Sequence, residues 1–183
     1  MRTYLLFFVL LTLAACNSPK VPVKKANVSS ILSAAGTDRV LGLLTKYYEL
    51  KNALVATDAL KVGDASTQLN VAVTMADTSL SRTDGKYAVE LDQYFDDITK
   101  QCSIMAGISD LSCERQRLVF AQISADMYSL LKAVSAKNSG AYKQFCPMAF
   151  NNKGAYWLSD EDEIRNPYFG KKMLECGEVQ DSL

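Results

Sequence analysis

The sequence predicts an all-α protein, an antiparallel up-down-up-down four-helix bundle with an irregular C-terminal cap. Three observations predict this fold. Apolar residues recur at helical spacing over four long stretches between residues 37 and 137. Short polar breaks separate these stretches, which favours antiparallel neighbours. After Gly140 the helical spacing is lost, and no alternating strand pattern of comparable length competes with the helices.

The first expected helix covers residues 37–57, with Thr37 or Asp38 as its N-cap, and the second covers residues 59–80, with Asp58 as its N-cap. Each stretch has one apolar stripe, as expected for a helix that packs on one side. The stripe of the first helix consists of Leu43, Tyr47, Leu50 and Leu54. The stripe of the second, built from smaller residues, consists of Val62, Ala65, Leu69, Ala72, Ala76 and Leu80.

The third expected helix covers residues 86–105 and ends at Gly107. Ser109 or Asp110 is the expected N-cap of the fourth, which extends to about Lys137 before a stop at Asn138-Ser139-Gly140. The buried face of the third helix is expected to hold Tyr87, Leu91, Tyr94, Ile98, Cys102 and Met105. That of the fourth is expected to hold Phe120, Ser124, Met127, Leu131 and Val134.

The C-terminal cap is expected to be irregular. Tyr142 to Phe150 suits a short extended piece, residues 159–165 a capped helical turn that ends at Asn166-Pro167, and residues 171–176 a short helix. The segment is too rich in aromatic residues, Met and Cys to be disordered. We therefore expect it to fold back against the bundle.

Residues 1–15 are predicted to be a lipoprotein signal peptide. Arg2 supplies a positive charge, and the apolar run from Tyr4 to Leu13 is too short to span a bilayer as a stable helix. The run ends in Leu13-Ala14-Ala15-Cys16, which is typical of a bacterial lipobox. Cys16 is therefore the expected lipidation site and membrane anchor.

The anchor divides the rest of the chain into a tether and a domain. Residues 16–36 contain two prolines and three lysines without helical spacing, so they are expected to be flexible. Residues 37–183 form the expected single domain. The residue after Cys16 is Asn17 rather than the Asp that signals retention in the inner membrane. We therefore expect the protein to be lipid-anchored in the cell envelope, in the outer membrane and facing the periplasm.

Composition excludes several functional classes. The 20 basic and 20 acidic residues balance, and no dense basic cluster is present, which argues against binding nucleic acid. The chain has no histidine, the commonest general base, and no phosphate-binding or nucleophile-elbow motif. We therefore expect no catalytic residues and do not expect an enzyme.

The strongest candidate site lies in the last forty residues. Cys146 and Met148 sit two residues apart around Pro147, and Met173 and Cys176 lie on the same side of one helical turn. Thiolates and thioethers are soft ligands that select Cu(I). The alternative is a disulfide between Cys146 and Cys176 with two core methionines, because exported cysteines usually pair. A reversible switch between the two states is a third interpretation.

Three other clusters have simpler interpretations. Cys102 and Cys113 flank the loop between the third and fourth helices, so a local disulfide is expected, with a second soft-metal site as the alternative. The acidic run from Asp160 to Glu163 is expected to be a solvated helix start rather than an acid–base pair. The aromatic cluster is expected to be a small core rather than a ligand cover, and it comprises Trp157, Tyr156, Tyr168 and Phe169.

Several blocks together resemble a bacterial domain of unknown function. They are Tyr48-Glu49-Leu50-Lys51-Asn52-Ala53-Leu54-Val55, Arg117-Leu118-Val119-Phe120, Phe145-Cys146-Pro147-Met148-Ala149-Phe150, Gly154-Ala155-Tyr156-Trp157-Leu158-Ser159, Glu163-Ile164-Arg165-Asn166-Pro167-Tyr168-Phe169-Gly170 and Met173-Leu174-Glu175-Cys176-Gly177. The resemblance covers about residues 38–180, with its Cys/Met motif at about 141–179. Members of that family occur as exported lipoproteins and as a C-terminal extension of periplasmic adaptor subunits of heavy-metal efflux pumps.

The resemblance implies metal handling and strengthens the metal interpretation of Cys146, Met148, Met173 and Cys176. It does not include Cys102 and Cys113, which favours a local disulfide for that pair. The expected function is a lipid-anchored protein that binds Cu(I) or Ag(I), for buffering or for hand-over to an efflux system. The expected partners are the membrane and a heavy-metal efflux adaptor or another envelope protein. The alternative is a disulfide-stabilised interaction module without metal.

Overall fold

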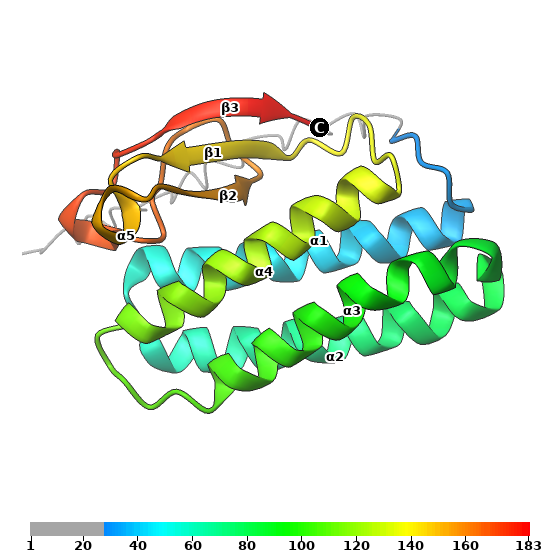
Figure 1. Cartoon of the computed structure of the whole chain (residues 1–183), viewed down its shortest axis with the longest axis horizontal. Coiled ribbons are helices and arrows are strands. Elements are labelled where there is room, and N and C mark those ends of the chain that lie inside the picture. Colours follow the sequence, from blue (N-terminus) through cyan, green and yellow to red (C-terminus); the bar gives the residue numbers. More distant parts are fainter. Residues whose placement is uncertain (1–27) are drawn as a thin grey trace, which may run out of the picture.

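The computed structural model describes residues 28–183. Four long helices are followed by a small three-stranded antiparallel sheet, and the helices are α1 (Ala34–Ala56), α2 (Ala59–Thr83), α3 (Gly85–Ala106) and α4 (Glu114–Ala133). The helices pack in chain order, and successive helices run in opposite directions (Figure 1). The helical bundle predicted for this part of the chain is confirmed.

The N-terminal caps explain where α1 and α2 begin. The predicted cap of α2 is confirmed, because the Asp58 carboxylate accepts a hydrogen bond from the Lys61 N–H at 3.1 Å. The first helix begins three residues earlier than predicted, because Ser33 caps it by accepting from the Gly36 N–H at 3.1 Å. The Asp84 carboxylate accepts in turn from the backbone N–H and the hydroxyl of Ser33.

The ends of α4 differ from the prediction at both sides. Asp110 forms a local turn with Ser112, and Cys113 has a left-handed backbone with φ 64°, so the helix begins at Glu114. It ends at Ala133 rather than near Lys137, because Ser135 also adopts a positive φ of 52°. The backbone of Lys137 then exchanges two hydrogen bonds with that of Ser29. Part of the segment predicted as a tether, residues 28–36, therefore contacts the end of α4 or belongs to α1.

The apolar stripes predicted for α1, α2 and α4 lie in the core, with Ala72 only partly buried. The face of α3 is rotated relative to the prediction. Ala88 and Phe95 are buried there, whereas Tyr87 and Tyr94 are only partly covered. Both faces of α3 offer apolar or aromatic surface at helical spacing, so the sequence pattern distinguishes them only weakly.

The prediction of a purely all-α chain is wrong for the C-terminal segment. Its elements are β1 (Tyr142–Cys146), a short turn labelled α5 (Ala149–Asn152), β2 (Ala155–Ser159), a 3₁₀ turn η1 (Gly170–Lys172) and β3 (Glu178–Ser182). The strand order is β2-β1-β3, with both pairings antiparallel. The sheet lies over the side of the bundle that contains α4, to which β2 packs (Figure 1).

The extended piece predicted from Tyr142 is confirmed as β1, but two predicted helical turns are not. Residues 160–169 form bends and turns without a helix, and only Gly170–Lys172 of the second segment is helical. Both segments obtain hydrogen bonds from buried side chains instead, as described below. None of the helices within residues 28–183 is long and apolar enough to cross a membrane. The predicted signal peptide 1–15 and the lipidation site Cys16 lie outside the described residues.

Candidate functional site

The structure brings Cys146 and Cys176 together, although thirty residues separate them in the sequence. Their Sγ atoms lie 2.9 Å apart. Cys146 is fully buried at the end of β1, and Cys176 is partly exposed in the turn before β3. Contact with the Cys146 thiol and burial raise the pKa of Cys176 to about 11. We call these two residues the dithiol pair.

The pairing of β1 with β3 places the dithiol pair. Phe145 is opposite Glu178 in that ladder, so the residues that follow one strand and precede the other meet at the same end of the sheet. Asn166, which is fully buried, holds the turn on the other side. Its backbone N–H donates to the carbonyl of Leu174 at 2.8 Å, and its side-chain amide donates to the carbonyl of Cys176 at 2.6 Å. Asn166 is a site residue that the sequence analysis missed.

Gly177 lets the turn approach the sheet closely. Its φ is 151°, and a Cβ at this position would lie 2.9 Å from both the Phe145 carbonyl oxygen and the Trp157 ring. Trp157 is fully buried, and its ring packs at 78° against that of Tyr168, with centroids 5.8 Å apart. The turn that carries Cys176 and Gly177 therefore packs on the aromatic cluster, in keeping with the interpretation of that cluster as a small core.

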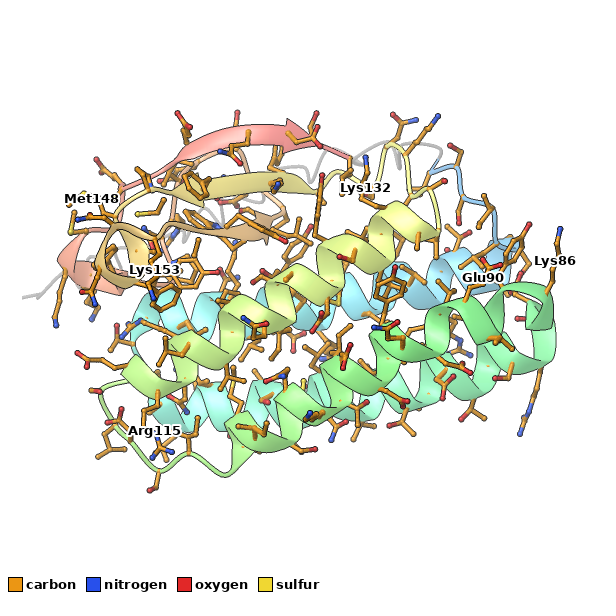
Figure 2. The ribbon with its side chains drawn as sticks, viewed as in Figure 1. Lys86, Glu90, Arg115, Lys132, Met148 and Lys153 are labelled. Atoms are coloured by element: carbon orange, nitrogen blue, oxygen red, sulfur yellow. The ribbon has the colours of Figure 1, made fainter. Side chains whose placement is uncertain are left out.

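The two predicted thioether ligands lie on the segments that carry the thiols. Met148 lies two residues after Cys146, the last residue of β1. Its side chain is 46% exposed and projects outward at the end of the sheet (Figure 2). Met173 is partly buried and shares one tight turn with Cys176, whose N–H donates to the Met173 carbonyl at 3.2 Å. Met173 and Cys176 also line the same shallow surface hollow.

Residues 28–183 hold no cluster of three or more Cys, Asp or Glu side chains placed to bind a metal ion. A third ligand at the dithiol pair would therefore have to be a thioether or come from another molecule. This donor set suits a soft ion of low coordination number and does not suit Zn²⁺, which requires four ligands, or Mg²⁺ and Ca²⁺, which require oxygen.

The second pair of cysteines has different surroundings. Cys102 in α3 and Cys113 before α4 are both fully buried, and neither is bonded to another cysteine in the described part of the chain. Burial raises the pKa of Cys102 to about 12 and also raises that of Cys113, against the opposing effect of Arg117. Both are therefore neutral thiols at physiological pH, packed in the core of the bundle.

Arg117 joins the C-terminal segment to the bundle. Its side chain is only 7% exposed and donates to the carbonyl of Pro167 at 2.9 Å, to that of Ser112 at 2.9 Å and to that of Leu54 at 3.3 Å. A fourth bond reaches the Thr57 hydroxyl at 3.0 Å. The end of α1, the start of α4 and the tail thus meet at one side chain.

Lys51 is a second buried cation that the sequence analysis missed. It lies on α1 and is 2% exposed, and its Nζ contacts Ser159 Oγ at 3.1 Å and Asp160 Oδ1 at 3.2 Å. Burial lowers the pKa of Lys51, and Asp160 opposes that effect. The sequence signal for this residue is its position beside Leu50 in the apolar stripe of the first helix, because lysine is almost never fully buried unless it is paired.

The acidic run is a loop rather than the helix start that was predicted. The Gln144 side chain, fully buried in β1, donates to the backbone carbonyls of Glu161, Asp162 and Glu163 at 2.9–3.1 Å. These bonds satisfy the carbonyls without a helical turn. The acidic side chains of this loop are exposed to solvent.

Fold and site together define a helical domain that carries a dithiol on a small C-terminal sheet. A family model described as "Protein of unknown function (DUF3347)" matches residues 43–139, and the chain belongs to this family. The matched residues extend from α1 to the end of α4, so the dithiol pair lies beyond them. No curated protein and no solved structure matches the chain.

Proposed function

We propose that this chain binds one soft metal ion, Cu(I) or Ag(I), at the dithiol pair, to buffer the ion or pass it to an efflux system. The observation that carries the proposal is the 2.9 Å separation of the Cys146 and Cys176 sulfur atoms. Two thiolates from two separate segments could share one ion if the sulfur atoms move apart, since two metal–sulfur bonds of about 2.3 Å place them farther apart than in the free pair. Met148 and Met173 are the candidate additional ligands, because each is joined to a thiol segment by a short, defined turn.

The raised pKa of the Cys176 thiol means that a metal ion must displace protons from the dithiol pair in order to bind. The pKa of Cys176 is raised to about 11, so the free site is protonated at neutral pH and metal binding releases protons. Cu(I) and Ag(I) are soft enough to displace those protons, whereas hard ions are not. Affinity is therefore expected to rise with pH over the neutral range.

The proposed place of the protein is the cell envelope. The lipobox that ends in Cys16 supports a lipid anchor. The resemblance to exported lipoproteins and to extensions of heavy-metal efflux adaptors supports an efflux adaptor as the partner that receives the ion. No step of the proposal requires catalysis.

The second candidate is a disulfide-closed interaction module. The same contact between Cys146 and Cys176 favours it, because an exported chain meets an oxidising environment. A disulfide that closes a loop of thirty residues would add about 3–4 kcal/mol to the free energy of unfolding in the chain-entropy model. In this state the sheet would be fixed to itself, and function would depend on a protein partner.

A titration separates the two candidates. Cu(I) is added to the reduced full-length chain in the presence of a competing chelator and a non-thiol reductant. We expect one tightly bound equivalent, lost in Cys176→Ser and retained in Cys102→Ser, the matched control with a buried thiol outside the site. Absence of stoichiometric binding, or equal binding by both variants, would overturn the metal proposal. A free-thiol count on protein purified without reductant then shows whether the pair is already closed as a disulfide.

A further inference from the structure

A second hollow lies between α1 and the C-terminal segment, on the other side of the turn that carries Cys176. Its volume is about 500 Å³, large enough for a small organic molecule. Leu174 lines this hollow and also the shallow one beside Cys176. Nothing in the proposed metal site uses it.

Three cations line the hollow. Lys51 comes from α1, Arg165 from the loop after β2 and Lys171 from η1. Arg165 lies close enough to Lys51 for its charge to contribute to the lowered pKa of that lysine, after burial as the main cause. The cations therefore belong to one electrostatic environment rather than to separate parts of the surface.

The acids at the hollow do not fully neutralise these cations. Asp160 and Glu161 also line it, which leaves one positive charge in excess. The ion pairs found within residues 28–183 join Lys46 to Glu49, Lys51 to Asp160, and Lys61 to Asp58. Arg165 and Lys171 are in none of them, so two side chains that favour anions face the hollow without a protein counter-ion among the described residues.

Lys51 gives the hollow a fixed donor. An ammonium group has three N–H donors, and in the described part of the chain two of them are used, by Ser159 and Asp160. The side chain is 2% exposed, so its position is set by packing, and the centroid of the Tyr48 ring lies 5.6 Å from its Nζ. The rest of the wall consists of the apolar Val55, Ala56 and Leu174 and the polar Asn52.

We infer that this hollow binds a small organic monocarboxylate with a short apolar chain. One excess positive charge matches one negative charge on the ligand. Arg165 supplies the planar, bidentate donors that suit a carboxylate, and Lys51 and Lys171 supply charge-assisted hydrogen bonds. The apolar wall beside α1 receives the hydrocarbon part.

Binding is measured on the metal-free full-length chain by following backbone amide NMR shifts during titration with butyrate. Butyramide, which is uncharged and of the same shape, tests the need for charge, and inorganic phosphate tests the need for the apolar part. We expect saturable shifts at residues around the hollow with butyrate, and binding at least about tenfold weaker for butyramide and for phosphate, since tenfold corresponds to the loss of one modest interaction.

The variants Arg165→Gln and Lys171→Gln remove exposed side chains, so they are expected to fold normally. Each should weaken butyrate binding by about tenfold or more, as expected for the loss of a charge-assisted bond. Lys172→Gln is the matched control, because Lys172 is the exposed neighbour that does not line the hollow. Absence of saturable shifts, equal binding of butyramide, phosphate binding as tight as butyrate, or an equal effect of the control would overturn the inference.

Discussion

Replacement of Arg117 by methionine tests how the C-terminal segment is held on the bundle. Methionine keeps most of the apolar stem and removes the guanidinium group. The carbonyl of Pro167 then loses its buried hydrogen bond, the carbonyl of Leu54 keeps only the bond from the Thr57 N–H at 3.0 Å, and the carbonyl of the exposed Ser112 can bond to water instead. Each unsatisfied buried acceptor costs about 1–3 kcal/mol.

The magnitude follows from these bonds. The one carbonyl left unsatisfied, that of Pro167, gives about 1–3 kcal/mol, the weakened bonding of the Leu54 carbonyl adds a smaller loss, and relief of the desolvation that lowers the pKa of Arg117 offsets part of the total. We expect Arg117→Met to lower the free energy of unfolding by about 2 kcal/mol. Arg115→Met is the matched control, since Arg115 lies two residues earlier in α4 and is exposed (Figure 2), and its change should stay within about 0.5 kcal/mol.

The assay is urea denaturation followed by two signals. Far-ultraviolet circular dichroism reports on the helices, and the fluorescence of Trp157, the only tryptophan, reports on the sheet. In Arg117→Met the fluorescence transition should come at lower urea than the helical one, because the tail loses its attachment first. Coincident transitions with a loss under about 1 kcal/mol would refute the assignment of Arg117 as the main tie.

Two further predictions concern a half-buried carboxyl and a glycine. Burial and the charge of Asp97 raise the pKa of Asp126 to about 6, so the folded state binds more protons than the unfolded one between about pH 4 and 6, and stability falls as pH rises through that range. Asp126→Asn should flatten that fall and add about 1 kcal/mol at neutral pH after solvent screening is allowed for, measured by urea denaturation across pH, and an unchanged pH profile would contradict it. Gly177→Ala should destabilise the chain by about 1–3 kcal/mol and weaken Cu(I) binding, because the added Cβ meets Trp157 and displaces the neighbouring thiol. Gly63→Ala, in open space on α2, should instead stabilise by about 0.5–1 kcal/mol, and equal effects of the two substitutions would sink the argument.

The bundle was predictable because its signals are local. Asp58 before an apolar stripe is enough to place the start of α2, and the stripe itself places the core. The start of α4 was not predictable, because it depends on the left-handed backbone of Cys113, a residue type with no special preference for that conformation. Ser33 was missed as the cap of α1 because its role is supported by Asp84, which is distant in sequence.

The sheet was not predictable because its order comes from pairing rather than pattern. The strand β3 is exposed throughout its five residues and has a single apolar residue, Val179, so it has no apolar alternation to detect. The four sulfur residues of the candidate site were recognised by their chemistry alone. Cys146 was grouped with Cys176 on that chemistry, but the β1–β3 ladder that brings the two thiols together was not foreseen. Three buried residues that hold the C-terminal segment by hydrogen bonds were missed, namely Asn166, Lys51 and Arg117. Their partners are backbone groups or loop residues far along the chain, which the sequence does not reveal.

The most direct test of the central claim is protection of thiols from alkylation. The reduced full-length chain is treated with an alkylating reagent under mildly denaturing conditions, with and without one equivalent of Cu(I), and each modified cysteine is located by mass spectrometry. The account predicts that Cu(I) protects Cys146 and Cys176 together and leaves Cys102 and Cys113 as reactive as before. Unchanged alkylation of Cys146 and Cys176, or equal protection of Cys102 and Cys113, would contradict a soft-metal site at the dithiol pair.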